Sequence, residues 1–198
     1  MEPLIPVPMN PDSLFTDPSG NIFKSLPDFI QQDLNILSIG LNPSINSVKA
    51  GFYFATPTNR FWKALNLSDL VEEPLIPGLS GHELLLEKYG LGFTDVVKRP
   101  SPGASDLRAA DFRFWSPVLE QKLLGLKPRV AWFHGKIAYP RFLKVTGREA
   151  EDIAWGAQNL TIGQTRIFVS PNPSPANAAF SLEVLTQAYS ELAQYLKE

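Results

Sequence analysis

The polar side chains best placed to do chemistry in this sequence lie on stiff, proline-containing loops. The first loop, residues 40–44, reads Gly-Leu-Asn-Pro-Ser. Its Asn42 is held in a stiff turn, because a proline fixes its own φ and restricts the residue before it. The amide either belongs to a functional site or satisfies backbone groups of its own turn. An amide has no useful basicity, so any catalysis by Asn42 must rest on orientation.

A second stiff loop covers residues 170–177 and reads Ser-Pro-Asn-Pro-Ser-Pro-Ala-Asn. Three prolines alternate with polar residues, directly after an apolar run. This pattern predicts a rigid, extended finger, because each proline fixes its own φ. The alternative is that the segment is only a stiff connection between a strand and a helix.

An acidic residue stands in a third loop, where residues 94–100 read Thr-Asp-Val-Val-Lys-Arg-Pro. If Asp95 faces a pocket, it can accept hydrogen bonds from a water or act as a general base beside Asn42. The alternative is a cap or an ion pair with Lys98 or Arg99. These two cations are candidate phosphate contacts, although an exposed basic pair is commonly only solvated.

The elements that must position these loops can be read from apolar spacing. Short apolar runs predict strands at 34–39, 92–97, 130–133, 159–162 and 166–170, the last two joined by a Gly163-Gln164 hairpin turn. Helical spacing predicts helices from near Arg60 and over residues 81–89 and 109–126. Ser181 is a candidate cap for a last helix.

Strands that alternate with helices predict an α/β fold, a three-layer α/β/α sandwich with a mostly parallel central sheet. In such sheets ligands bind outside the carboxyl ends of the strands, and the three loops, 40–59, 95–103 and 170–179, leave those ends. We expect a single domain over residues 34–198. Residues 1–33 are expected to form an irregular N-terminal arm with one short helix around residues 26–32.

Composition excludes several classes of function. The 198 residues include no cysteine and two histidines, which argues against disulfides, thiolate catalysis, iron–sulfur clusters and a histidine-rich metal site. We therefore expect neither metal nor cofactor, and we interpret His134 as structural and His82 as a surface residue. No apolar run is long enough for a membrane span and no signal peptide is recognised, so a cytoplasmic protein is expected. A monomer is also expected. The net charge of −2 still permits a local basic patch.

Taken together, the motifs resemble one family, the mismatch-specific uracil and thymine DNA glycosylases of the uracil-DNA glycosylase superfamily. Residues 40–44 resemble its Gly-Ile-Asn-Pro-Gly motif, and residues 51–55 and 59–63 resemble the segment that follows. Residues 155–156, 160–163 and 172–174 resemble its C-terminal part, in order and at similar spacing. The resemblance covers about residues 34–197.

The resemblance implies a monofunctional glycosylase that flips uracil, or another damaged or mismatched pyrimidine, out of DNA and hydrolyses its glycosidic bond in base excision repair. Asn42 would position the attacking water. Asp95 is a second catalytic candidate on the argument from its own chemistry given above, not from the resemblance. Phe54 would stack on the base. The other implied base-binding residues are Leu41, Ser44 and Asn172, and the implied DNA-binding residues are Asn59, Arg60, Lys98, Arg99, Ser174, Pro175, Ala176 and Asn177. The expected partner is double-stranded DNA that contains uracil or a mismatch, with single-stranded DNA also a candidate.

Three departures from the family pattern affect these expectations. Asp95 is not the residue expected at its position, and Ser44 replaces a glycine, which narrows or re-polarises the pocket. The finger is one residue longer and carries the small Ala176 near the position of a bulky apolar wedge. A small wedge penetrates less, so we expect weak dependence on the opposing base.

Two other functions remain open. A nucleotide hydrolase on the same fold is weakened because the sequence shows neither a glycine-rich phosphate loop nor a carboxylate cluster. A non-catalytic sensor of mismatched or damaged DNA is disfavoured by Asn42 and Phe54, because a sensor needs no amide that positions water.

Overall fold

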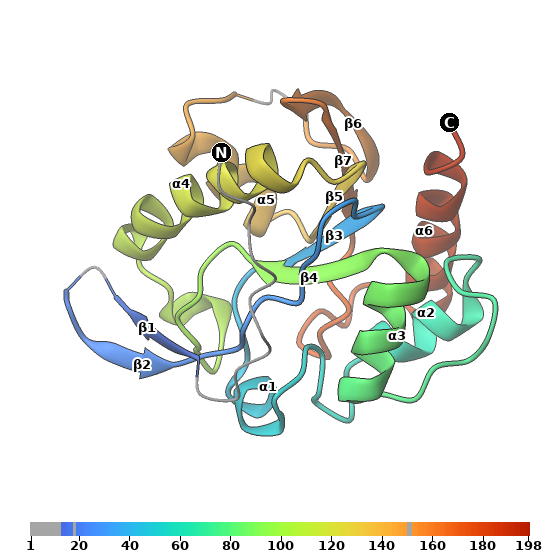
Figure 1. Cartoon of the computed structure of the whole chain (residues 1–198), viewed down its shortest axis with the longest axis horizontal. Coiled ribbons are helices and arrows are strands. Elements are labelled where there is room, and N and C mark those ends of the chain that lie inside the picture. Colours follow the sequence, from blue (N-terminus) through green and yellow to red (C-terminus); the bar gives the residue numbers. More distant parts are fainter. Residues whose placement is uncertain (1–12, 18, 150–151) are drawn as a thin grey trace.

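A five-stranded sheet runs through the centre of the computed structural model, which describes residues 13–17, 19–149 and 152–198 (Figure 1). The strand order is β4-β3-β5-β7-β6, and all neighbours are parallel except the antiparallel β6–β7 pair. The mostly parallel sheet predicted from the sequence is confirmed. The strands are β3 (Ile36–Gly40), β4 (Leu91–Asp95), β5 (Val130–His134), β6 (Gly156–Ile162) and β7 (Thr165–Ser170).

Helices cover both faces of this sheet, which gives the expected three layers. Figure 1 shows α4 (Ala109–Leu126) and α5 (Ala138–Val145) on one face, and α2 (Phe61–Leu67), α3 (Leu79–Tyr89) and α6 (Leu182–Tyr195) on the other. Successive strand residues point to opposite faces. In β5, Ala131 and Phe133 accordingly join the core under α4 and α5, whereas Val130 and Trp132 join the core under α2 and α6. Both faces of β5 are buried, as its continuous apolar run predicts.

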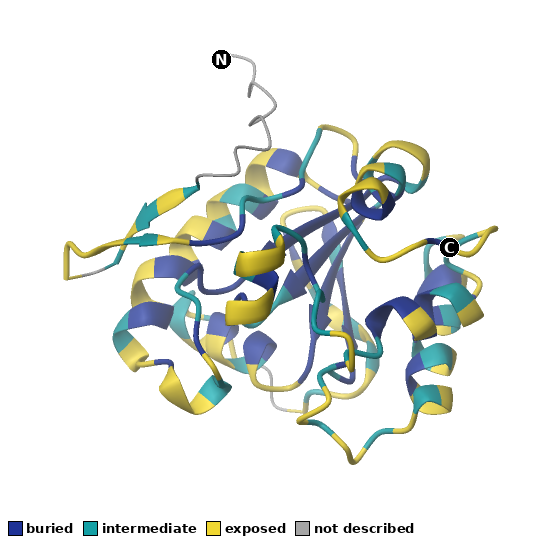
Figure 2. Cartoon of the chain, turned by 90° about the horizontal axis from the view of Figure 1, so that it is seen from below, coloured by how far each residue is buried: buried dark blue, intermediate teal, exposed yellow. Residues whose placement is uncertain are grey.

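The outer faces of the helices are exposed, and the strands β3, β4, β5 and β7 are the most deeply buried elements (Figure 2). α4 begins and ends as predicted. The Ser181 hydroxyl accepts a hydrogen bond from the Val184 amide and so caps α6, which confirms that prediction. Of the helices in the part of the chain that the structure describes, none is long and apolar enough to cross a membrane.

The N-terminal residues differ from the expected irregular arm. A hairpin of β1 (Leu14–Thr16) and β2 (Ile22–Lys24) precedes an extended segment, while residues 1–12 of the expected arm lie outside the described residues. The helix predicted over residues 26–32 is wrong. Phe29 instead pairs with Phe93 of β4 through two backbone hydrogen bonds, and its side chain is buried in the core together with Leu26.

Two helices were not anticipated. α1 (Ile45–Ala50) lies in the segment expected as a long loop, with Ser44 as its N-cap. α5 follows β5 through Gly135, and its proline stands within the first turn, where a missing amide hydrogen is tolerated. His82 is fully buried among aromatic rings rather than exposed, and burial lowers its pKa to about 4.

Candidate active site

A pocket of about 840 Å³ opens where the carboxyl ends of four parallel strands meet. The segments after β3, β4, β5 and β7 each contribute to its lining, as the position of ligands in such sheets predicts. Its lining includes Leu41, Asn42, Ser44, Phe54, Asp95, His134 and Asn172. The loops predicted from separate parts of the sequence are therefore brought together.

Asn42 is held in one orientation by its amide nitrogen. Nδ2 donates to Ser101 Oγ at 2.8 Å, to the carbonyl of Arg99 at 3.0 Å and to the carbonyl of Pro43 at 3.3 Å. Two of these acceptors are carbonyls, which require the NH₂ group on that side. The opposite atom, Oδ1, is an acceptor on a residue that lines the pocket, so the geometry suits it to orient a water molecule.

Asp95 ends β4 directly opposite Gly40 of β3, two residues before Asn42. The close approach depends on the glycine, because a Cβ at position 40 would stand 2.5 Å from Asp95 Oδ1. The carboxylate is buried, and its Oδ2 has no hydrogen-bond partner in the described structure. Burial raises the pKa of Asp95 to about 6, while the nearby Lys98 acts in the opposite direction. A carboxylate with such a pKa can take up a proton near neutral pH.

Phe54 forms an aromatic wall on one side of the pocket. Its ring stacks on Phe61 with centroids 4.1 Å apart and planes within 11°, and His134 meets it edge-on at 5.2 Å. Its backbone has a φ of 56°, a conformation that costs a non-glycine residue energy and that the surrounding packing must hold. One ring face is thus occupied by Phe61, which leaves the residue suited to stack with its other face.

The finger follows β7 and closes another side of the pocket. Asn172 Oδ1 accepts the Ser174 amide at 2.9 Å, which leaves its NH₂ group as a donor. Asn177 donates through Nδ2 to the Asn172 carbonyl at 3.0 Å, and its backbone amide donates to Ser174 at 2.9 Å. Pro175 and Ala176 are exposed at the tip. The finger is therefore a turn held by internal hydrogen bonds, with a small apolar tip.

Comparison with known proteins decides the family. A sequence profile described as the uracil DNA glycosylase superfamily matches residues 27–196. The chain belongs to the uracil DNA glycosylase superfamily. A solution NMR structure of a candidate uracil DNA glycosylase from Methanosarcina acetivorans is similar, with a TM-score of 0.59 and 22% identity over 88% of this chain and 98% of that one. At this identity the likeness concerns the fold, which agrees with the uracil-DNA-glycosylase-like sandwich expected from the sequence.

Membership of the superfamily supports a DNA glycosylase that hydrolyses N-glycosyl bonds. It leaves open the mismatch-specific branch of the superfamily that the motifs resemble. Within the described residues, no three acidic or histidine side chains are arranged to hold a metal ion.

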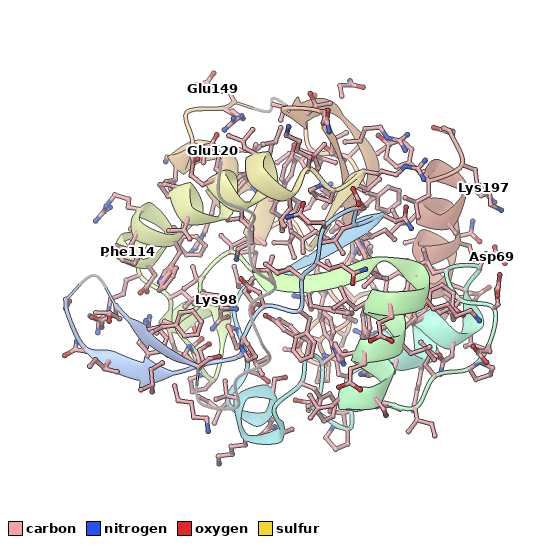
Figure 3. All side chains as sticks on the ribbon, in the orientation of Figure 1. Asp69, Lys98, Phe114, Glu120, Glu149 and Lys197 are labelled. Atoms are coloured by element: carbon pink, nitrogen blue, oxygen red, sulfur yellow. The ribbon has the colours of Figure 1, made fainter. Side chains whose placement is uncertain are left out.

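Lys98 is not at the surface of this glycosylase domain, so the expected phosphate contact is wrong. Its ammonium group lies inside the fold (Figure 3), where it donates to Asp28 Oδ1 at 2.9 Å and to the Tyr53 hydroxyl at 3.1 Å. The Lys98 ammonium also lies 3.7 Å from Asp95 Oδ2. Asp95 therefore forms the ion pair that was one of its two expected roles, and it also lines the pocket. Lys122 pairs with the other oxygen of Asp28. Burial would raise the pKa of Asp28, but the two lysines hold it below its ordinary value.

Arg99 and Arg60 are also engaged within the protein rather than free to bind phosphate. Arg99 forms a bidentate pair with Asp111, at 2.9 and 2.7 Å, and donates to the Asp106 carbonyl. Arg60 donates to backbone carbonyls of the finger. Asn59 lines the pocket, and its side-chain oxygen accepts the Phe61 amide at the start of α2.

Ser44 and Leu41 line the pocket, as expected, and both also have structural contacts. The Ser44 hydroxyl accepts the Ser47 amide at 3.1 Å and donates to the Ser47 hydroxyl at 3.0 Å, so it caps α1. The Leu41 carbonyl accepts the Val97 amide at 3.0 Å and fixes the β3 loop against the β4 loop.

Sequence reasoning missed two residues of the site. Ser101 anchors Asn42, and its position between two prolines was the available signal. His134, interpreted as structural, makes a 2.8 Å hydrogen bond to Ser38 through Nε2, but it also lines the pocket and its buried Nδ1 has no partner in the described structure. Burial lowers the pKa of His134 to about 3, so the ring is neutral at physiological pH.

Proposed function

We propose that this chain is a monofunctional uracil-DNA glycosylase that flips uracil out of DNA and hydrolyses its glycosidic bond in base excision repair. The observation that carries the proposal is that one pocket holds both an oriented amide, Asn42, and a buried carboxylate, Asp95. The two residues lie at the ends of adjacent strands, beside the aromatic wall of Phe54. The superfamily match supports the class of reaction.

Binding of the flipped base would use groups already held in place. The free face of Phe54 stacks on the base, a contact worth about 1–3 kcal/mol. The Asn172 NH₂ group can donate to a pyrimidine carbonyl, because its oxygen is already committed to Ser174. This donor would also stabilise the negative charge that develops on the departing base.

The chemical step then needs a water on the opposite side of C1′. Asn42 Oδ1 orients this water, and its oxygen bonds to C1′ as the bond from C1′ to uracil N1 breaks. The electron pair leaves with the base, and the water's proton passes to the ionised Asp95. The developing positive charge on the sugar is stabilised by the same carboxylate. The protein uses no amine nucleophile in this scheme, so the product is an intact abasic strand.

The first experiment is cleavage of a labelled duplex with one uracil, followed by alkali to break abasic sites. Wild type should give strand breaks only after alkali. We expect Asn42→Ala to lower the rate by about 10²–10³-fold, because a positioned group is lost. Asp95→Ala should lower it by about 10²–10⁴-fold if the carboxylate takes the proton. Asp69→Ala is the matched control, because Asp69 is exposed and does not line the pocket.

The two variants also show how much of the catalysis depends on Asn42 and how much on Asp95. A large loss for Asn42→Ala with little loss for Asp95→Ala would assign the reaction to water orientation alone. A wild-type protein that binds the duplex but leaves uracil intact opposite both G and A would refute the proposal. That outcome would favour a non-catalytic sensor of damaged or mismatched DNA.

A further inference from the structure

The Arg60 guanidinium lies against the backbone of the finger. Nη2 donates to the carbonyls of Ser174 and Asn177, each at 2.9 Å, and Nε donates to that of Pro173 at 3.4 Å. Nη1 donates to the Phe180 carbonyl, and the backbone amide of Arg60 also donates to Pro173, at 3.2 Å. One side chain therefore joins four carbonyls spread over eight residues of the chain.

These contacts are specific to a guanidinium. Its planar fork presents five N–H donors in fixed directions, whereas an ammonium group is a point with three donors on a flexible stem. Within the described residues no carboxylate lies within ion-pair distance of Arg60, so the positive charge is not neutralised by a partner. The side chain thus acts as a multiple hydrogen-bond donor to carbonyls that converge on it.

The same short segment also supports the aromatic wall. Phe61, the first residue of α2 and the neighbour of Arg60, stacks under Phe54. Phe61 is completely buried in the core beneath α2 and α6. The start of α2 therefore fixes the finger through Arg60 and the base-stacking ring through Phe61, so the two parts of the site have a common support.

We propose that Arg60 is a positioning residue that holds the finger in the shape that opens the duplex, a role that rests on the proposed glycosylase function. A wedge must resist the stacking and pairing of the DNA it enters, so its backbone must be ordered before binding. The prolines fix individual φ angles, but they do not fix the finger relative to the pocket. Arg60 supplies that link, and a misplacement of about 1 Å can cost about 10²-fold in rate.

The test compares Arg60→Lys and Arg60→Ala with wild type on opening of a duplex. The probe is a duplex with one 2′-fluoro-2′-deoxyuridine, which resists cleavage, beside 2-aminopurine, whose fluorescence rises when its neighbour unstacks. We expect both variants to lower the rate of opening by about 10–100-fold. Excision from a paired duplex should fall by a similar factor, and excision from a uracil inside a pre-opened bubble should fall less than threefold.

Controls separate the alternatives. Arg113, an exposed residue of α4, gives the matched variants Arg113→Lys and Arg113→Ala, which should leave opening unchanged. Arg60→Lys keeps the charge and serves as the test if Arg60→Ala does not fold. An equal loss on paired and bubble substrates would overturn the proposal, because Arg60 would then support the pocket in general. Unchanged opening by Arg60→Lys would overturn it as well.

Two further outcomes are distinguishable. If Arg60 binds phosphate, Arg60→Ala would weaken binding to all duplexes and reduce the salt dependence of binding by about one charge, with opening of the bound duplex unchanged, which overturns the proposal. If wild type excises uracil from neither substrate, the proposed function fails, but the fluorescence measurement still shows whether Arg60 is needed to open DNA.

Discussion

At the scale of single residues, Asn42 and Asp95 have complementary chemical capacities. The NH₂ group of Asn42 is fixed by three acceptors and the amide has no basicity, so Asn42 can act only by orienting another group. Asp95 can take up a proton, but the fold holds its carboxylate buried and one of its oxygens lacks a hydrogen bond. A group kept in such a state lowers the stability of the fold, and such groups are characteristic of functional sites.

Asp95→Asn is therefore expected to stabilise the protein at neutral pH. Folding raises the pKa of Asp95 from 3.8 to about 6, so the protonated carboxyl favours the folded state below pH 4, and this contribution is lost as pH rises through 6. The ionised carboxylate then costs on the order of 3 kcal/mol. Asparagine avoids this cost, and Lys98 keeps Asp28 as its partner. Thermal unfolding from pH 4 to 8 should show a gain of several degrees at pH 7–8 and little at pH 4.

The control for this prediction is Asp69→Asn, at an exposed position, which should leave the melting temperature unchanged at all pH values. If Asp95→Asn instead lowers the melting temperature at pH 8 more than at pH 4, the carboxylate is stabilised by Lys98 beyond the cost of its burial.

At the scale of elements, the proposed function gives the finger the role of sensing the base opposite the uracil. Its tip carries Pro175 and the small, exposed Ala176. A small side chain fills little of the gap left by a flipped base, so excision of uracil opposite G and opposite A should differ by much less than several hundredfold. Ala176→Leu should increase the discrimination by about tenfold, because a larger apolar group in a tight site is worth about 1–3 kcal/mol.

The measurement is kcat/KM on duplexes that contain uracil opposite G, uracil opposite A, and on single strands. Ala178→Leu, two residues further along at another exposed position, is the control and should not change the ratio. A wild-type preference of several hundredfold for the G mismatch would show that a small tip does not weaken recognition of the opposing base.

Elements with a continuous apolar pattern were predictable from the sequence, and elements fixed by tertiary contacts were not. α4 carries apolar residues at helical spacing over eighteen positions, and its predicted ends are confirmed. α1 has only six residues and one buried side chain, so its apolar pattern is too short to detect. The remaining local signal for α1 is the serine at its N-cap, Ser44, a residue type preferred at that position.

The candidate site was likewise predictable in part from the sequence. The loops were found because proline-rich sequence at the ends of buried strands is unusual, and the structure brings them together around one pocket. The basic residues were misjudged, because charge alone does not tell a surface cation from a buried one. The charge of the buried Lys98 is compensated by the Asp28 carboxylate, which lies seventy positions earlier in the chain. No local pattern links two residues at such a separation.

At the scale of the whole molecule, the segment before β3 is part of the glycosylase core. Leu26 and Phe29 are each 1% exposed, and Asp28 is the common partner of Lys98 and Lys122. Loss of a buried leucine or phenylalanine side chain costs about 2–5 kcal/mol each. Removal of Asp28 also leaves two lysine charges inside the fold without their shared carboxylate, which is strongly destabilising.

A chain that begins at residue 34 should therefore fail to fold cooperatively, because these losses together approach the whole stability of a typical domain, about 5–15 kcal/mol. A chain that begins at residue 25 keeps Leu26, Asp28 and Phe29. It loses the β1–β2 hairpin, whose Phe15 contacts Trp115 edge-on at 6.0 Å, so it should fold with a lower melting temperature. Circular dichroism and thermal unfolding of the two truncated chains and the full chain test this order. Equal melting temperatures for the chain from residue 34 and the full chain would show that the domain is complete without the preceding segment, as the apolar pattern of the sequence alone suggested.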